Sequence, residues 1–120
     1  MASKKPETKL VKKIIKALEK QFSPSLWTKI HGGPYQVTGI SDIIGCYKKE
    51  FYALEVKVPG KEHTVTARQQ LFIDLINLAG GHGTMITSVD QGISFVTRNQ
   101  RKKRRLIVGA SVGKRDIYLT

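Results

Sequence analysis

Three charged residues near the middle of the chain have the types and spacing needed for metal-assisted chemistry. Asp42 precedes the apolar run 43–47, and Glu55 and Lys57 lie within the next apolar run, 51–58. A short polar segment separates the two runs, and this pattern predicts a β-hairpin. Side chains alternate between the faces of a strand, so Glu55 and Lys57 share one face. Charged groups in an apolar hairpin require pairing or a cation, because buried unpaired charge is costly.

Two carboxylates beside a lysine suit the cleavage of phosphodiester bonds with a divalent cation. Mg²⁺ prefers oxygen ligands, which carboxylates and a main-chain carbonyl supply. The cation neutralises the scissile phosphate and lowers the pKa of the attacking water, while the lysine orients that water or stabilises developing charge. The alternative is an ordinary Glu-x-Lys pair on the solvent face of a strand. The Gly39-x-x-Asp42 lead and the apolar flanks favour the site.

The charge of the chain favours a nucleic-acid partner. A net charge of +12 over 120 residues predicts a polyanion, with nucleic acid ahead of an anionic membrane. A basic RNA-binding protein would share this charge, but it would not need acids at its centre. We expect one domain, 1–120, with a core at about 7–96 and a basic C-terminal extension at about 97–120.

No apolar run approaches the length of a membrane span, and the first residues lack an apolar signal region. The single cysteine, Cys46, lies in an apolar run, where we expect it to pack rather than react. These features are typical of a cytoplasmic protein in a reducing environment.

Two helices are predicted to carry further site residues. Apolar spacing indicates a helix at about 7–20, with Glu7 at the edge of its inward face. Glu7 is therefore a third candidate acid, although a favourable interaction with the helix dipole explains it equally simply. Thr66 and Gln69 have the form of a capping box that starts a second helix. Gln69 lies near the inward face, so capping and a site role remain level alternatives. The residues expected to be buried on this helix are Phe72, Leu75, Ile76 and Ala79.

The remaining segments predict strands at 26–31 and 84–89, with the second helix as a right-handed crossover between the Glu55 strand and the latter. Ile93–Val96 is interpreted as a strand or a helix end. Residues 106–108 and 116–119 are interpreted as two late strands. The pattern as a whole predicts an α/β fold.

The order of Glu7, Gly39–Asp42, Glu55–Lys57 and Thr66–Gln69 resembles the PD-(D/E)xK nuclease superfamily. It is more closely similar to stand-alone virus-type replication-repair nuclease (VRR-NUC) domains, many of them carried by phages. The resemblance covers about residues 7–89, and Ser41 stands where the family usually has proline. It implies a restriction-endonuclease-like fold, a central mixed β-sheet flanked by helices.

The resemblance also implies Mg²⁺ or Mn²⁺ held by Asp42, Glu55 and the main-chain carbonyl of Val56, with Glu7 nearby. Lys57 would be the catalytic lysine, and Gln69 would position it or the water. Small members resemble homodimers that cut branched DNA such as four-way (Holliday) junctions. A two-fold dimer supplies the two symmetric cuts that a junction needs. The alternatives are a non-catalytic nucleic-acid-binding protein, or a nuclease of the same fold acting on another DNA structure or on RNA.

Residues expected to contact DNA are basic or lie close to the site in sequence. They are Lys29, His31, Tyr35, Lys61, Arg68, Arg101, Lys102, Lys103, Arg104 and Arg105. A loop histidine such as His31 is more often simply solvated. The basic segment 98–105 would contact phosphates without reading the base sequence.

Overall fold

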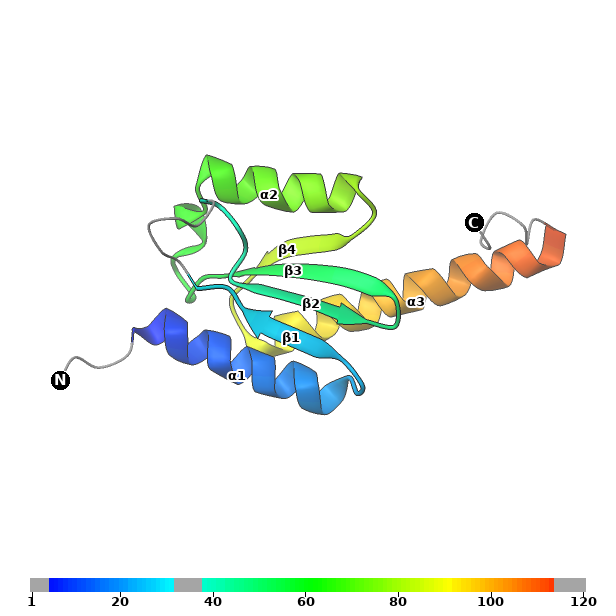
Figure 1. The fold of residues 1–120 in the computed structure, drawn as a ribbon, viewed down its shortest axis with the longest axis horizontal. Helices are drawn as coiled ribbons and strands as arrows, with labels where there is room; N and C mark the ends of the chain where they lie inside the picture. The colour runs from blue at the N-terminus through cyan, green and yellow to red at the C-terminus, as the bar shows by residue number, and fades with distance from the viewer. Residues whose placement is uncertain (1–4, 32–37, 114–120) are drawn as a thin grey trace.

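A computed structural model describes the backbone of residues 5–31 and 38–113, and side chains in these ranges up to residue 103 (Figure 1). Its elements, in chain order, are α1 (Pro6–Gln21), β1 (Leu26–Lys29), β2 (Ile43–Tyr47), β3 (Glu50–Val56), the 3-10 turn η1 (Glu62–Thr64), α2 (Ala67–Leu78), β4 (His82–Ile86) and α3 (Val89–Gly113). None of the helices in the described part of the chain is both long and apolar enough to cross a membrane.

The four strands form one mixed sheet in the order β1-β2-β3-β4. Neighbouring strands are antiparallel from β1 to β3, whereas β3 and β4 are parallel and joined by α2. Helices α1 and α3 pack against each other and cover one face, while α2 lies on the other (Figure 1). The expected α/β fold with a mixed sheet flanked by helices is therefore confirmed.

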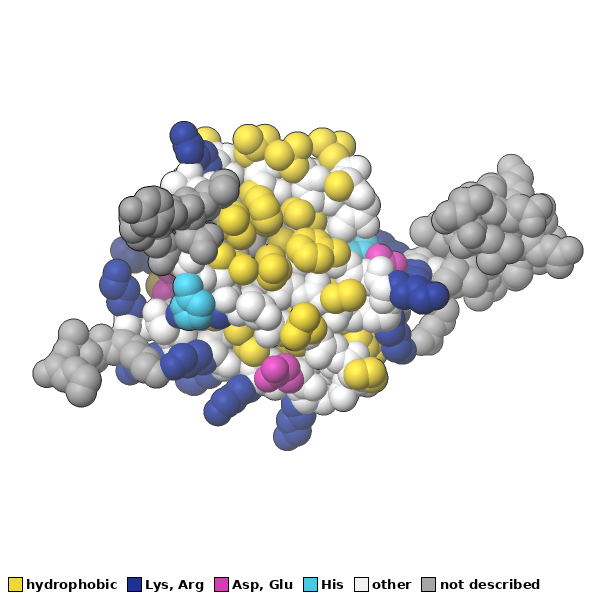
Figure 2. Space-filling view, viewed as in Figure 1, with side chains coloured by type: hydrophobic (Ala, Val, Ile, Leu, Met, Phe, Trp, Pro, Cys, Tyr) yellow, Lys and Arg dark blue, Asp and Glu magenta, His cyan; other side chains and the backbone are white. Residues whose placement is uncertain are grey.

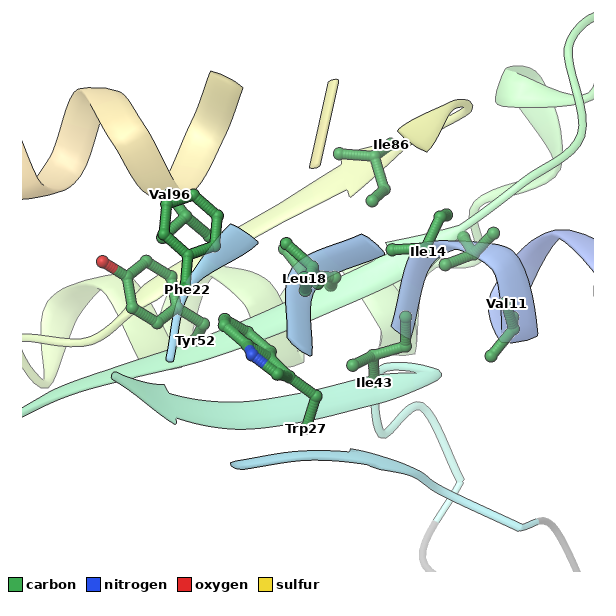
Figure 3. Packing of buried hydrophobic residues seen from close by; sticks show 11 residues of the cluster. Val11, Ile14, Leu18, Phe22, Trp27, Ile43, Tyr52, Ile86 and Val96 are labelled. Carbon is green, nitrogen blue, oxygen red and sulfur yellow. The ribbon is translucent and has the colours of Figure 1, made fainter. Parts of the chain in front are cut away.

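The core lies between the sheet and the pair α1 and α3. Helix α1 turns the stripe Val11, Ile14 and Leu18 inward, as its apolar spacing predicts, and its lysines lie mainly outside. Figure 3 shows this stripe against the aromatic and aliphatic side chains of the sheet and of α3. The sheet and α3 contribute Trp27, Ile43, Tyr52, Leu54, Val56, Ile86 and Val96. The central strand β3 is buried on both faces, which leaves little room for unpaired charge.

The predicted hairpin is present, and its turn is tight. Tyr47 pairs with Glu50, so the loop has only two residues, Lys48 and Lys49, with φ of 49° and 70°. Two positive φ angles are typical of a type I′ turn, which usually takes asparagine and glycine. Lys103 of α3 holds this turn: its Nζ donates to the Lys48 carbonyl over 2.6 Å and lies 3.6 Å from Glu50 Oε1.

Helix α2 begins at the predicted capping box and ends before Gly80, whose φ of 97° suits a helix C-terminus. Asn77 ties it to β4: its side-chain amide donates to the Gly83 carbonyl over 3.0 Å and accepts from the Gly83 N–H over 2.9 Å. Because β3 and β4 are parallel and these Gly83 groups bond Asn77, they lie on the free edge of β4.

The predicted buried face of α2 is partly wrong. Ile73 is the residue of α2 that is buried, whereas Leu75 is 54% exposed and Ala79 is also exposed. Phe72 and Ile76 are half-buried. The helix is apolar on two sides, so its sequence does not reveal which side packs. Gly83 decides the rotation by giving Ile73 room close to the sheet.

The expectations for the last third of the chain are also corrected. Residues 106–108 belong to α3 and form no strand, whereas for Ile93–Val96 the helix alternative holds, since this segment lies in the first turns of α3. The expected boundary at residue 97 falls inside this helix. Ser88 starts α3 by accepting from the Gln91 N–H over 3.1 Å. Its basic run continues the helix because lysine, arginine and glutamine are good helix formers. The strand expected at 116–119 lies outside the described residues.

Candidate active site

Asp42 is held against the end of β3 by main-chain hydrogen bonds. The Val56 N–H donates to Asp42 Oδ2 over 2.8 Å, and the Asp42 carbonyl accepts from the Ile30 N–H over 2.8 Å. The pairing of Ile43 with Leu54 fixes the register that makes these contacts. The hairpin therefore places the Asp42 carboxylate beside Glu55, as the sequence predicts.

Glu55 is a buried acid with an unused oxygen. The residue is 1% exposed, its Oε2 lies 3.7 Å from Lys57 Nζ, and its Oε1 has no hydrogen-bond partner. Burial, followed by the negative charge of Asp42 and a hydrogen bond with that carboxyl, raises the pKa of Glu55 to about 8. The opposing charge of Lys57 does not outweigh these effects.

Lys57 lies just after β3 and is itself 8% exposed. The main-chain N–H of Lys57 donates to the Ile86 carbonyl over 3.0 Å, and this bond extends the pairing of β3 with β4 by one residue. This main-chain bond sets the direction of the side chain toward Glu55. Glu55 and Lys57 thus lie together in one buried site at the end of the sheet. Burying two ionisable groups lowers the free energy of unfolding, so stability by itself does not explain their presence.

Glu7 joins this group from α1. Burial is the largest influence that raises the pKa of Glu7, and the charge of Asp42 is the next. Lys57, Lys5 and Lys29 act in the opposite direction. These interactions place Glu7 in the same electrostatic environment as Asp42, and its position in the first turn also suits the helix dipole.

The donor set fits a hard divalent cation in part. Asp42 and Glu55 offer two carboxylates, and the Oε1 of Glu55 has no hydrogen-bond partner among the described protein groups. Within the described ranges, no three His, Cys, Asp or Glu side chains are grouped so that they could hold a metal alone. A bound cation would therefore take further oxygens from the main chain and water.

The loop before Asp42 is fastened to the start of α2. Arg68 Nη1 donates to Thr38 Oγ1 over 2.5 Å. Gly39 has φ of 92°, and a Cβ there would approach the Arg68 backbone to 2.9 Å, so glycine is required on both counts. The leading glycine of the Gly-x-x-Asp motif thus serves this close approach.

Gln69 acts as a cap. Its Oε1 accepts from the Thr66 N–H over 2.9 Å, and its own N–H donates to Thr66 Oγ1 over 3.1 Å. The predicted capping box is therefore confirmed, with Oε1 engaged in it. The site role that the resemblance implies for Gln69 stays a prediction.

The expected DNA-contacting residues occupy several surfaces. Lys29 is half-exposed and influences Glu7, whereas His31, Lys61, Arg101 and Lys102 are exposed. Lys103 is engaged with the hairpin turn. Tyr35 lies outside the described residues, as do the side chains of Arg104 and Arg105, although their backbone belongs to α3.

Sequence reasoning gave Ser41 no role, yet it is one of the most buried residues. It is 0% exposed, and its hydroxyl has no hydrogen-bond partner. A buried hydroxyl without a partner is unusual. The one feature of the sequence that could have drawn attention to Ser41 is its position directly before Asp42.

Comparison with known proteins assigns no family to this geometry. A scan against protein-family models found no match, and a search of curated proteins found none either. The resemblance to VRR-NUC domains therefore stays a prediction, and any statement about function rests on the described side chains.

Proposed function

We propose that this chain is a divalent-cation-dependent, structure-selective DNA endonuclease of the PD-(D/E)xK type. The observation that carries the proposal is the buried Glu55 carboxyl, with a raised pKa and a free oxygen, beside Asp42 and Lys57. Burial of such a group costs stability, which favours a functional reason for its presence. Acids with perturbed pKa values gather at functional sites. The net charge of +12 supports a polyanionic substrate.

Asp42, Glu55 and the Val56 carbonyl would hold Mg²⁺ or Mn²⁺, with Glu7 close by. When bound, the cation would supply Lewis-acid stabilisation of the scissile phosphate and activation of water. Glu55 must give up its proton to act as a ligand, because a carboxylate and not a carboxylic acid binds a hard cation. Asp42 is held in place by the Val56 N–H, so its remaining oxygen is pre-oriented.

Lys57 would act on the substrate as a fixed positive charge. Burial and the contact with Glu55 restrict its ammonium group to the site, so little reorganisation is needed when negative charge develops on the phosphate. The exposed basic residues of α3, Arg101 and Lys102, would contact phosphates farther along the nucleic acid.

The substrate that we propose is a branched DNA, a four-way junction in particular, cut by a homodimer. Two symmetric active sites match two symmetric cuts. The second candidate is a non-catalytic nucleic-acid-binding protein, which the basic helix α3 favours. Acids at the centre of the molecule oppose it, since they repel phosphate unless a cation lies between them.

The test is cleavage of a labelled four-way junction, compared with linear duplex, single-stranded DNA and RNA, with Mg²⁺ or with EDTA. We expect paired, metal-dependent cuts in the junction, lost in Glu55→Gln and in Asp42→Asn while binding persists. The matched control is Glu19→Gln, which neutralises an exposed acid on α1 and should cut normally. If Glu55→Gln and Asp42→Asn both cut the junction as fast as the wild type, the proposed site is refuted. If the wild type binds the junction but makes no metal-dependent cut, the non-catalytic nucleic-acid-binding protein is favoured.

A further inference from the structure

The face of the sheet beside α2 exposes apolar side chains. Leu26 pairs with Cys46, and Cys46 pairs with Phe51, so these three residues form one row across the strands. All three are exposed, and the expectation that Cys46 packs inside is therefore wrong. In Figure 2, hydrophobic side chains gather over the middle of the molecule, and lysine and arginine lie mainly around its margin. A charged ligand is therefore better accommodated at an edge of the sheet than over this face.

Such a place exists at the free edge of β4, where a groove of about 280 Å³ lies between this strand and the first turns of α3. We call it the β4–α3 groove. The residues that line it are Thr84, Met85, Ile86, Asp90, Gln91, Ser94, Phe95 and Arg98. Its volume is just below the roughly 300 Å³ at which ligand pockets begin, so it suits a small ligand such as a single base.

Met85 brings free main-chain groups to the β4–α3 groove. The Lys57 N–H bonds the Ile86 carbonyl, so the alternation along a parallel strand turns the main-chain groups of Met85 to the free edge. The described residues give the Met85 N–H no partner, and the Met85 carbonyl has only a long contact of 3.5 Å from the Thr84 hydroxyl. One donor and one acceptor therefore lie side by side at the groove.

The two neighbouring edge positions are already occupied by side-chain amides. Asn77 bonds both main-chain groups of Gly83, and Gln91 Oε1 accepts from the Thr87 N–H over 2.7 Å. An extended peptide needs several open residues in a row, so it could pair with Met85 alone. A nucleobase carries its donors and acceptors on the edge of one planar ring, and one open residue is enough for it.

Phe95 offers the flat apolar wall that a base requires. Its side chain is half-buried in the groove, and its ring meets that of Tyr52 edge-on with 6.3 Å between the ring centroids. This contact holds the Phe95 ring in place. Aromatic side chains stack on bases of any sequence, because every base has a π-face.

The two ends of the β4–α3 groove carry opposite charges. Asp90 and Arg98 lie about 12 Å apart along the axis of α3. Among the described residues, neither of them forms an ion pair. A guanidinium binds phosphate through two parallel hydrogen bonds, whereas a carboxylate repels it. The phosphate of a bound nucleotide would therefore lie at the Arg98 end.

We propose that the β4–α3 groove binds one unpaired nucleotide, with its base against Phe95 and the main chain of Met85 and its phosphate on Arg98. A base inside a duplex is stacked and paired, so it cannot enter the groove unless it leaves the stack. Two sources share this chemistry: a free mononucleotide, and an unpaired nucleotide within a nucleic-acid strand.

The groove borders the candidate active site, and its role in substrate choice rests on the proposed function. Met85 pairs with Glu55, so one strand spacing of about 4.8 Å separates their main chains. An endonuclease that holds a nucleotide there would prefer DNA with an unpaired nucleotide close to the cut. Binding in the groove needs neither the cation nor cleavage, so the two proposals can fail separately.

The first test follows the main-chain amide signals of Met85 and Phe95 by NMR in EDTA while deoxycytidine monophosphate is added. We expect both signals to shift, whereas deoxyribose phosphate, which lacks a base, should leave the Met85 signal unchanged. Arg98→Gln changes an exposed side chain and should weaken binding about tenfold, because a charged hydrogen bond is lost. Lys16→Gln is the matched control, since it removes the same charge from an exposed position on α1.

Three results would overturn the proposal. The first is a Met85 signal that does not move at about 10 mM nucleotide. The second is an equal response to deoxyribose phosphate, and the third is an equal loss of affinity in Arg98→Gln and Lys16→Gln. A tetrapeptide with a free carboxylate that shifts the same signals at lower concentration would assign the groove to a peptide instead.

A second measurement identifies the source of the nucleotide. The same signals are followed in EDTA with a DNA duplex that has one unpaired cytidine and with the matching, fully paired duplex. A Met85 shift with the first duplex alone would support a nucleotide held within a nucleic-acid strand. A Met85 signal that responds to the mononucleotide and to neither duplex would support a free nucleotide. Because EDTA prevents metal-dependent cutting, neither result depends on cleavage.

Discussion

Replacing Glu55 by glutamine should stabilise the protein at mildly alkaline pH when no divalent cation is present. In the folded state burial and Asp42 raise the pKa of Glu55 from its ordinary 4.5 to about 8. Between these values the unfolded chain releases a proton that the folded protein keeps. The free energy of unfolding therefore falls as pH rises through this window, and the contribution is complete below 4.5 and lost above 8. Glutamine does not titrate, so the variant escapes the loss.

The magnitude follows from the width of that window. At about 1.36 kcal/mol for each pH unit, the interval corresponds to about 5 kcal/mol for one buried carboxyl. The substitution also removes the carboxylate that lies 3.7 Å from Lys57, and this buried ammonium then has less compensation. We therefore expect the net gain of the variant at pH 8 to be smaller, about 2 kcal/mol.

The assay is urea unfolding from about pH 5 to 8 in EDTA, followed by the fluorescence of the single tryptophan, Trp27, which is 4% exposed. The stability curves of wild type and Glu55→Gln should diverge as pH rises. Added Mg²⁺ should stabilise the wild type and not the variant, since a ligand that binds the folded state raises its stability. Parallel pH curves for the two proteins would refute the burial argument. Glu19→Gln, an exposed acid, should follow the wild type throughout.

Three further changes test other parts of the structure. Lys48→Asn with Lys49→Gly should raise the free energy of unfolding by about 1–2 kcal/mol, because both positions have positive φ, and a decrease in urea unfolding would contradict the turn geometry. Leu18→Ala should lower it by about 2–5 kcal/mol, since Leu18 is 0% exposed, and a loss below about 1 kcal/mol would count against its core position. Neutralising Arg101 and Lys102 with glutamine should reduce the slope of log K against log salt for DNA binding by about 2, and an unchanged slope would exclude α3 from the contact.

The parts of the fold that sequence predicts well are those with local signals. The stripe of α1, the hairpin around its polar turn and the capping box of Thr66 and Gln69 each depend on residues within a few positions of one another. The pairing of Asp42 with Glu55 follows from the hairpin once its register is set. The position of Glu7 near Asp42 could be predicted because Glu7 lies at the edge of the buried stripe of α1.

The parts that sequence does not predict depend on tertiary packing. Helix α2 has Ile73 on one side and Leu75 on the other, and periodicity alone does not choose between them. The apolar residues 106–108 suggest a strand, but they follow a basic segment that is already helical. The hydrogen bond from Lys103 Nζ to the Lys48 carbonyl joins residues 55 positions apart, and no local sequence pattern predicts it. Contacts of this kind become visible only when the sheet and α3 are assembled.

Asn77 has a consequence for how these chains behave when crowded together. A strand at the rim of a sheet presents free main-chain groups that can template a strand from another molecule, the first step toward fibrils. On β4 the amide of Asn77 already occupies both main-chain groups of Gly83. A foreign strand would have to displace this amide before it could add there. Through Asn77, helix α2 therefore opposes the addition of a foreign strand at this position of the β4 edge.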